Sequence, residues 1–209
     1  AATLARKPTA GIQDMHTWSS LRSLTPIFFL IGSLLHWDVY GAVSPAILML
    51  AIAMPFWLVS LLSRKKSDAR TTYSFLVAAY WLAAGLVIWL EGPTKLAFNT
   101  IHDDQKFYAL LATGMAADTL ESIPVQTEGQ LAVLAWRYLY GLAEEFGMPR
   151  WPVIAISLNI VAMAAAGALS VKTVESVCGV DRQRSLWVSG LYVCCGLFLL
   201  SATCHMRDA

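Results

Sequence analysis

Runs of apolar residues alternate with polar segments along the 209-residue chain. The runs are 24–37, 44–63, 73–90, 152–171 and 186–204. The first is short for a membrane span, although a helix that begins near Trp18 would lengthen it. The 20 residues of 152–171 rise about 30 Å as a helix, which matches the hydrocarbon thickness of a bilayer. The pattern predicts an all-α, polytopic membrane helix bundle of about five transmembrane helices, three in 24–90 and two in 152–204, as a single membrane domain over 1–209.

The long segment between the third and fourth runs, 91–151, is amphipathic rather than uniformly apolar. Apolar residues recur at helical spacing in 103–118 and again in 128–146. They are Phe107, Leu110, Leu111 and Met115 in the first stretch, and Leu131, Leu134, Ala135, Tyr138 and Leu142 in the second. Both stretches are too polar to span a bilayer, so we expect two interfacial helices in a large outer loop.

The second of these helices has recognisable end signals. Thr127 followed by Gln130 is typical of a capping box, in which each side chain satisfies a backbone N–H of the first turn. Gly147 and Pro149 are typical of the residues that follow a helix. We therefore expect a well-formed helix over 128–146.

The distribution of Lys and Arg predicts how the bundle is oriented. The tail 1–23 and the short loops after the second and fourth runs are rich in these residues, whereas the much longer 91–151 holds few. The basic residues of the two loops are Arg64, Lys65, Lys66, Arg70, Lys172, Arg182 and Arg184. The positive-inside rule places the tail and both loops in the cytoplasm, and 38–43, 91–151 and 205–209 outside.

The composition supports a membrane protein and excludes some functions. Hydrophobic residues make up 57% of the chain and charged residues 14%, with a mean hydropathy of +0.56. Soluble domains have about 25% charged residues. A net charge of +1 without a basic stripe gives no sign of nucleic-acid binding. The four cysteines form no C-x-x-C pair, so we interpret them as small buried hydrophobes rather than a zinc or disulfide framework.

Two neighbouring carboxylates, Asp103 and Asp104, are the candidate chemistry of the chain. One interpretation is structural, because Thr100 followed by Asp103 resembles a helix cap and acidic residues in a first turn complement the helix dipole. The other is functional. Two adjacent carboxylates repel each other unless they hold a cation or one of them is protonated and available for acid–base work. Mg²⁺ or Mn²⁺ with a phosphate-bearing ligand would suit such a pair.

Other polar residues fall at the same predicted outer face: His36, Asp38, His102, His205, Arg207 and Asp208. Imidazole and carboxylate groups are ordinary metal ligands, so a metal site is one interpretation. The other is that these are polar residues at the ends of membrane helices. No pair has the spacing of a known metal motif.

Polar and aromatic residues within the predicted helices have two interpretations each. Asn159, inside the fourth run, is expected to form an interhelical hydrogen bond rather than contact a substrate. Trp136, Tyr138 and Tyr140 on the second outer helix either anchor it at the membrane interface or line a sugar or lipid groove.

The order of these features resembles the GT-C superfamily, which are polytopic membrane glycosyltransferases with polyprenyl-phosphate-linked sugar donors. "FNTIHDDQKFYALLATGM" is similar to their first outer loop, where an acidic residue or pair precedes a Tyr-containing amphipathic helix. "AWRYLYGLAEEFGMPRWPVIAISLNIVAMAAAGAL" follows the same course into the next span. The closing "SATCHMRDA" is similar to a basic–acidic pair of polysaccharide-polymerase-like members. The resemblance covers roughly 73–209.

The resemblance implies sugar transfer from a polyprenyl-phosphate donor on the extracytoplasmic side, in polysaccharide biosynthesis at a bacterial inner membrane. Asp103 or Asp104 would be catalytic, accepting a proton from the acceptor hydroxyl or helping to hold a divalent cation. His102, Tyr108 and Arg207 would bind substrate. Since family members usually have many more spans, the chain would correspond to an N-terminal portion. The alternative function is a small non-enzymatic membrane subunit that scaffolds a larger membrane complex.

Overall fold

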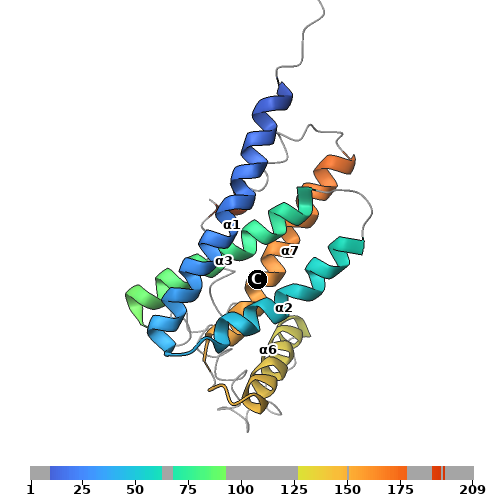
Figure 1. The fold of residues 1–209 in the computed structure, drawn as a ribbon. Helices are drawn as coiled ribbons and strands as arrows, with labels where there is room; N and C mark the ends of the chain where they lie inside the picture. The colour runs from blue at the N-terminus through green and yellow to red at the C-terminus, as the bar shows by residue number, and fades with distance from the viewer. Residues whose placement is uncertain are drawn as a thin grey trace, which may run out of the picture.

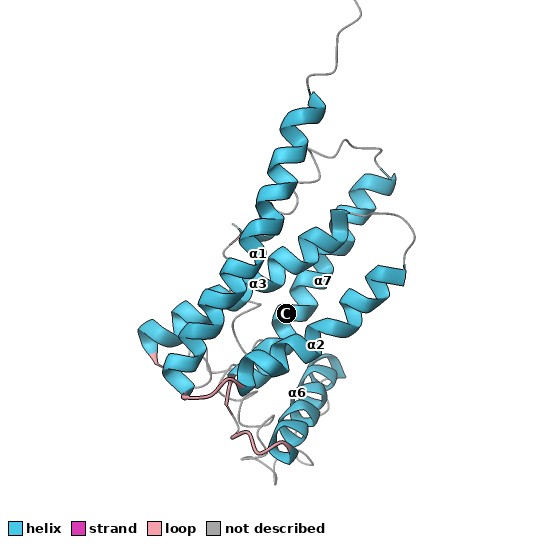
Figure 2. Cartoon of the chain, in the orientation of Figure 1, coloured by secondary structure: helices cyan, strands magenta, loops and turns pink. Residues whose placement is uncertain are grey.

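The computed structural model describes residues 10–62, 68–92, 127–149, 151–177, 190–193 and 195. Regular structure in this part of the chain is entirely helical, as predicted. The helices are α1 (Ala10–Tyr40), α2 (Ser44–Leu62), α3 (Asp68–Glu91), α6 (Thr127–Glu145) and α7 (Val153–Val177) (Figures 1 and 2). The expected helix 103–118 and most of the expected span 186–204 lie outside the described residues.

Two of the described helices are long and apolar enough to cross a membrane. They are Ala69–Leu90 in α3, with a mean hydropathy of 1.8, and Val153–Val177 in α7, with 2.0. The apolar part of α2, Ser44–Val59, is shorter. These findings agree with the predicted spans 73–90 and 152–171 but do not confirm a bundle of five spans. A core helix of a soluble protein can have the same length and composition. The side chains on the outer surface of the bundle therefore have to indicate whether these helices lie in a membrane.

Several helix limits differ from the predicted ones. α1 already begins at Ala10 and so includes part of the expected tail, and it continues through the first residues of the expected turn to Tyr40. α3 begins at Asp68, which places Arg70 on a helix rather than in a loop. α7 continues to Val177 and includes Lys172. Apolar patterning underestimates these helices because their ends carry polar residues, even where those residues are buried, as Thr71 and Thr72 are.

Helices α1, α2, α3 and α7 alternate in direction along the chain (Figure 1). α1 packs along α3, α3 and α2 both pack on α7, and α6 covers the beginning of α7. The N-terminal parts of α1 and α3 therefore lie at one end of the bundle, which we call the arginine end because it holds Arg22 and Arg70. The opposite end holds α6 and the C-terminal ends of α1 and α3, which are Tyr40 and Glu91, and we call it the α6 end.

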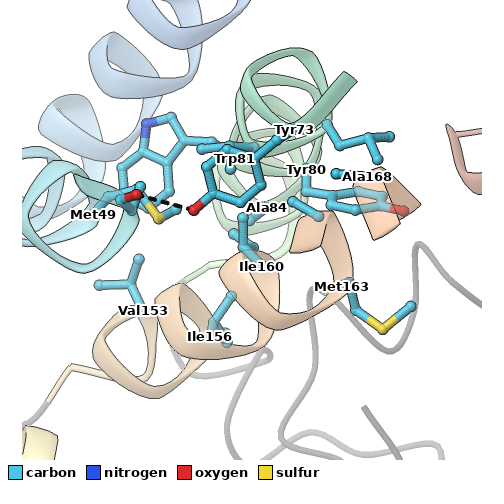
Figure 3. Packing of buried hydrophobic residues seen from close by; sticks show 14 of the residues in the cluster. Met49, Tyr73, Tyr80, Trp81, Ala84, Val153, Ile156, Ile160, Met163 and Ala168 are labelled. Carbon is cyan, nitrogen blue, oxygen red and sulfur yellow. Dashed lines mark hydrogen bonds between the residues drawn. The ribbon is translucent and has the colours of Figure 1, made fainter. Parts of the chain in front are cut away.

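The core forms between α3 and α7. Buried residues of α3 repeat at helical spacing from Tyr73 to Ile88 and meet an equivalent stripe on α7 (Figure 3). Tyr73 also donates a hydrogen bond from its hydroxyl to the Ala53 carbonyl of α2, at 3.1 Å. Small residues bring part of α7 close to α3: a Cβ added at Gly167 would lie 2.5 Å from Leu76 Cδ1. The Ala-rich stretch 162–168 of α7 therefore packs closely against α3.

The end of α6 follows the sequence signal. Met148 N–H donates to the Ala143 carbonyl at 2.9 Å and Gly147 N–H to the Glu144 carbonyl at 2.8 Å. This pair of bonds is a Schellman motif, which requires a positive φ at the residue after the cap, and Gly147 has φ 71°. The helix predicted over 128–146 is thus confirmed within one residue at each end.

Candidate functional site

The residues that the sequence singled out for chemistry are not placed by the structure. His102, Asp103, Asp104, Tyr108 and Arg207 all lie outside the described residues. His205 and Asp208, the other expected outer-face residues near the end of the chain, lie outside them as well. Their predicted roles in catalysis, substrate binding and Mg²⁺ or Mn²⁺ binding stay predictions. Three arrangements within the described part can be examined for function.

The first arrangement is a buried histidine on α1. The imidazole of His36 is only 1% exposed and stacks on the indole of Trp81, with ring centroids 3.7 Å apart and an interplanar angle of 1°. Its Nδ1 lies 2.7 Å from the Gly32 carbonyl, and because a carbonyl only accepts, Nδ1 carries the proton. Within the described part of the protein, Nε2 has no hydrogen-bond partner.

His36 therefore does not join Asp38 at an outer surface, as one interpretation of the sequence required. The Asp38 carboxylate instead accepts a hydrogen bond from Trp89 Nε1 at 3.1 Å in an exposed position. Among the residues that the structure describes, no group of three or more His, Cys, Asp or Glu could hold a metal ion. The histidine is drawn inward because Gly32 and Gly85 let α1 and α3 approach: a Cβ at Gly85 would lie 3.0 Å from His36 Nδ1.

The second arrangement joins α6 to α7. Trp136 Nε1 donates a hydrogen bond to Asn159 Oδ1 at 3.1 Å, and both side chains are buried. This bond confirms the expected interhelical role of Asn159. Trp136 and Tyr140 are buried against α7, so their side chains pack inside the protein and are not exposed on its surface. Tyr138 is 72% exposed and fits the interpretation as an anchor.

The contact between α6 and α7 excludes water from Tyr140, which is 2% exposed. Burial, with a smaller contribution from nearby Tyr40, raises the pKa of the Tyr140 hydroxyl well above its ordinary value. The hydroxyl is thus a neutral packing group and not a candidate acid or base. α6 is therefore held against α7 by the hydrogen bond between Trp136 and Asn159 and by the packing of Trp136 and Tyr140.

The third arrangement is a cleft between α1, α2 and α3 with a volume of about 540 Å³, within the range of about 300–1,000 Å³ typical of ligand pockets. Most of its lining is apolar or aromatic: Pro26, Phe29, Leu50, Ala53, Met54, Trp57, Tyr73, Val77 and Ala78. Arg22 and Arg70 provide the two charged side chains, beside the hydroxyl residues Thr25, Thr71 and Ser74. Arg22 Nε donates to Thr71 Oγ1 at 3.3 Å, which holds α1 and α3 together at the arginine end.

Sequence reasoning used Arg22 and Arg70 only as markers of orientation. Each arginine nevertheless lies on the same helical stripe as lining residues: Arg22 precedes Thr25, Pro26 and Phe29, and Arg70 precedes Tyr73, Ser74 and Val77. That spacing in the sequence indicates that each arginine lies on the same helix face as the residues that line the cleft. The spacing does not indicate that the stripe on α1 faces the stripe on α3.

Known proteins do not identify this arrangement. No protein-family model, no curated protein and no solved structure matches the chain. The resemblance to GT-C glycosyltransferases consequently rests on the order of sequence features alone, and function has to be argued from the residues and their geometry.

Proposed function

We propose that this protein is an integral membrane protein whose helices α1, α2, α3 and α7 lie in a bilayer. The observation that carries the proposal is the outward face of α1 and α2. Exposed large apolar side chains follow that face over 24–37 of α1 and 47–59 of α2: Leu24, Ile27, Leu30, Ile31, Leu34 and Trp37 on α1, and Ile47, Leu50, Met54, Trp57, Leu58 and Val59 on α2. A surface helix of a soluble protein would carry polar residues there. Apolar surface of this extent fits hydrocarbon.

Within this frame we propose that the chain takes part in GT-C-type glycosyl transfer from a polyprenyl-phosphate-linked donor. The segment that carries Asp103 and Asp104 follows Gly92, which comes directly after α3 at the α6 end, away from Arg22 and Arg70. Since the positive-inside rule assigns the arginine end to the cytoplasm, this segment departs from the extracytoplasmic end. That is the side on which lipid-linked donors of this type are used by the superfamily.

The role that we propose for each residue follows from the chemistry of its side chain. One carboxylate of the Asp103–Asp104 pair accepts the proton of the acceptor hydroxyl or helps to hold Mg²⁺ or Mn²⁺ beside the donor phosphate. His102, Tyr108 and Arg207 bind the substrate. The polyprenyl phosphate is itself a good leaving group, so no enzyme nucleophile is needed.

The catalytic part of the proposal is tested with the double variant Asp103→Asn, Asp104→Asn. The assay follows transfer of sugar from a panel of polyprenyl-phosphate monosaccharides to membrane acceptors, in membranes that contain equal amounts of each protein. Glu145→Gln, an exposed carboxylate at the same end, is the matched control. We expect loss of transfer only in the aspartate variant, by about 100-fold or more, because general acid–base catalysis typically contributes factors of this size. Full transfer by the correctly inserted double variant would exclude the catalytic role.

The second candidate function is a non-enzymatic membrane subunit. The same apolar face of α1 and α2 that suits lipid also suits the helices of a partner. This function predicts that the chain purifies from native membranes at a fixed ratio with another membrane protein. It also predicts that the Asp103→Asn, Asp104→Asn variant keeps that ratio and causes no loss of sugar transfer.

A further inference from the structure

We propose that the cleft between α1, α2 and α3 binds an anionic phospholipid of the surrounding leaflet, with one acyl chain in the cleft and the phosphate at Arg22 and Arg70. The proposal rests on the membrane location argued above but is independent of glycosyl transfer. The site lies at the arginine end, away from the α6 end to which the catalytic aspartates were assigned.

The apolar part of the cleft suits a hydrocarbon chain. Three helices contribute to it, and its lining beyond the arginines and hydroxyl residues is aliphatic or aromatic. The wall formed by α2 is open to the surroundings, since Leu50 and Met54 are each more than half exposed and Trp57 is 41% exposed. In a bilayer, that wall faces acyl chains rather than water. A lipid tail can therefore enter sideways without crossing a polar barrier.

The polar part of the cleft suits a phosphate. Both charged side chains of the lining are arginines, and among the described residues that line the cleft neither Asp nor Glu occurs. A guanidinium group presents five N–H donors in a fork that matches phosphate oxygens, and the bond from Arg22 to Thr71 uses only Nε. Arg22 and Arg70 line the same cleft, so an anion placed there is attracted by both positive charges.

The position along the helices matches the depth of a headgroup. Arg22 and Arg70 precede the apolar stripes of α1 and α3 in sequence, and the two helices run in the same direction. The charges consequently lie at one end of an apolar channel, which is the arrangement of headgroup and tail in a phospholipid. The cytoplasmic leaflet, to which basic residues assign this end, is also the leaflet whose anionic lipids attract Lys and Arg.

The test compares lipids retained by the full chain. Protein is reconstituted in nanodiscs that contain equal parts of phosphatidylglycerol and phosphatidylcholine, released into mild detergent, and analysed by native mass spectrometry. We expect wild-type protein to retain one phosphatidylglycerol, with about tenfold preference over phosphatidylcholine. Both lipids offer a phosphate for charge-assisted hydrogen bonds, but only phosphatidylglycerol has a net negative charge that the two arginines attract. Arg22→Gln, Arg70→Gln should lose this preference.

Three controls separate a specific site from general effects. The double variant Arg137→Gln, Lys172→Gln removes the same charge from exposed positions outside the cleft and should retain phosphatidylglycerol as wild type does. Ala53→Phe fills the cleft and should reduce binding of both lipids, with unchanged helix content by circular dichroism. Excess glycerol phosphate, a headgroup without tails, should not displace the lipid.

Several results would overturn the proposal: equal retention of both lipids by the wild type, equal loss in the Arg137/Lys172 control, or displacement by glycerol phosphate. If Ala53→Phe fails to fold, the arginine variants still decide the question. An alkaline wash of membranes is performed in parallel. Release of the chain by this wash would contradict the membrane location itself, whereas a retained chain without lipid preference would contradict the lipid site alone.

Discussion

Asn159 and His36 are both buried polar side chains within apolar helices, but they differ in the partners of their polar atoms. Asn159 accepts the indole N–H of Trp136 and so joins α6 to α7. His36 satisfies Nδ1 on its own helix and turns its ring face to Trp81. A buried polar atom is costly unless it is hydrogen-bonded, so the Asn159 bond stabilises a helix contact, whereas His36 contributes mainly through stacking.

At the residue scale we predict that Trp136 and Asn159 are energetically coupled. Asn159→Leu leaves the indole N–H buried without its acceptor and should lower the free energy of unfolding by about 1–3 kcal/mol. In a Trp136→Phe background the same change should cost about 1 kcal/mol less, because no N–H remains to be satisfied. The measurement is a double-mutant cycle by denaturant titration in detergent. Thr173→Ala, an exposed change on the same helix, should have almost no effect. Strict additivity of the two variants would contradict the coupling.

At the element scale the close crossing of α1 and α3 depends on glycine. A Cβ at Gly32 would lie 2.8 Å from Trp81 Cδ1 and 3.0 Å from the backbone N and Cα of Leu82. The side chain of Trp81 is itself held by the His36 stack and by a hydrogen bond to Ser33 at 3.1 Å. Neither neighbour can move without separating the two helices.

We therefore predict that Gly32→Ala destabilises the protein by about 1–3 kcal/mol, as overpacked core substitutions do. The matched control is Gly141→Ala on α6, where a Cβ meets no atom within 4 Å. There alanine should stabilise the helix by up to about 1 kcal/mol, because it loses less backbone entropy than glycine. Thermal unfolding followed by circular dichroism in detergent distinguishes the two. Equal shifts of the melting temperature in both variants would disprove a close crossing at Gly32.

At the scale of the whole molecule the alternating helices create two chemically different ends. The arginine end carries the two arginines of the cleft, and the α6 end carries a helix with exposed Tyr138. In a bilayer these ends face different compartments. The lipid site and the proposed catalytic aspartates would then serve opposite leaflets.

This separation predicts opposite accessibility of the two ends. In a background without native cysteines, a membrane-impermeant maleimide should label Tyr138→Cys in intact cells. It should label Thr173→Cys only after the cells are permeabilised, and buried Ala164→Cys in neither case. Labelling of Tyr138→Cys and Thr173→Cys from the same side would contradict the orientation.

Local physics explains which features could be read from the chain itself. The helix over 128–146 was predictable because the capping signal in the sequence, Thr127 with Gln130, and the Schellman glycine Gly147 act over a few residues. Long apolar runs likewise predicted the helical class and the two described helices, α3 and α7, that are long and apolar enough to cross a membrane. The hydrogen-bonding role of Asn159 followed from its polarity alone, since an amide inside an apolar helix needs a partner.

Contacts between distant residues needed the tertiary structure. Arg22 and Thr71 are 49 positions apart, and His36 and Trp81 are 45 apart by their numbers, so no local period can reveal that they meet. The apolar pattern shows that a side chain prefers a nonpolar neighbour, but not which neighbour it obtains. Sequence by itself thus determined the helical class, the strongest apolar segments and the ends of α6. Only packing decided that His36 points inward, that Trp136 is buried, and that two arginines share one cleft.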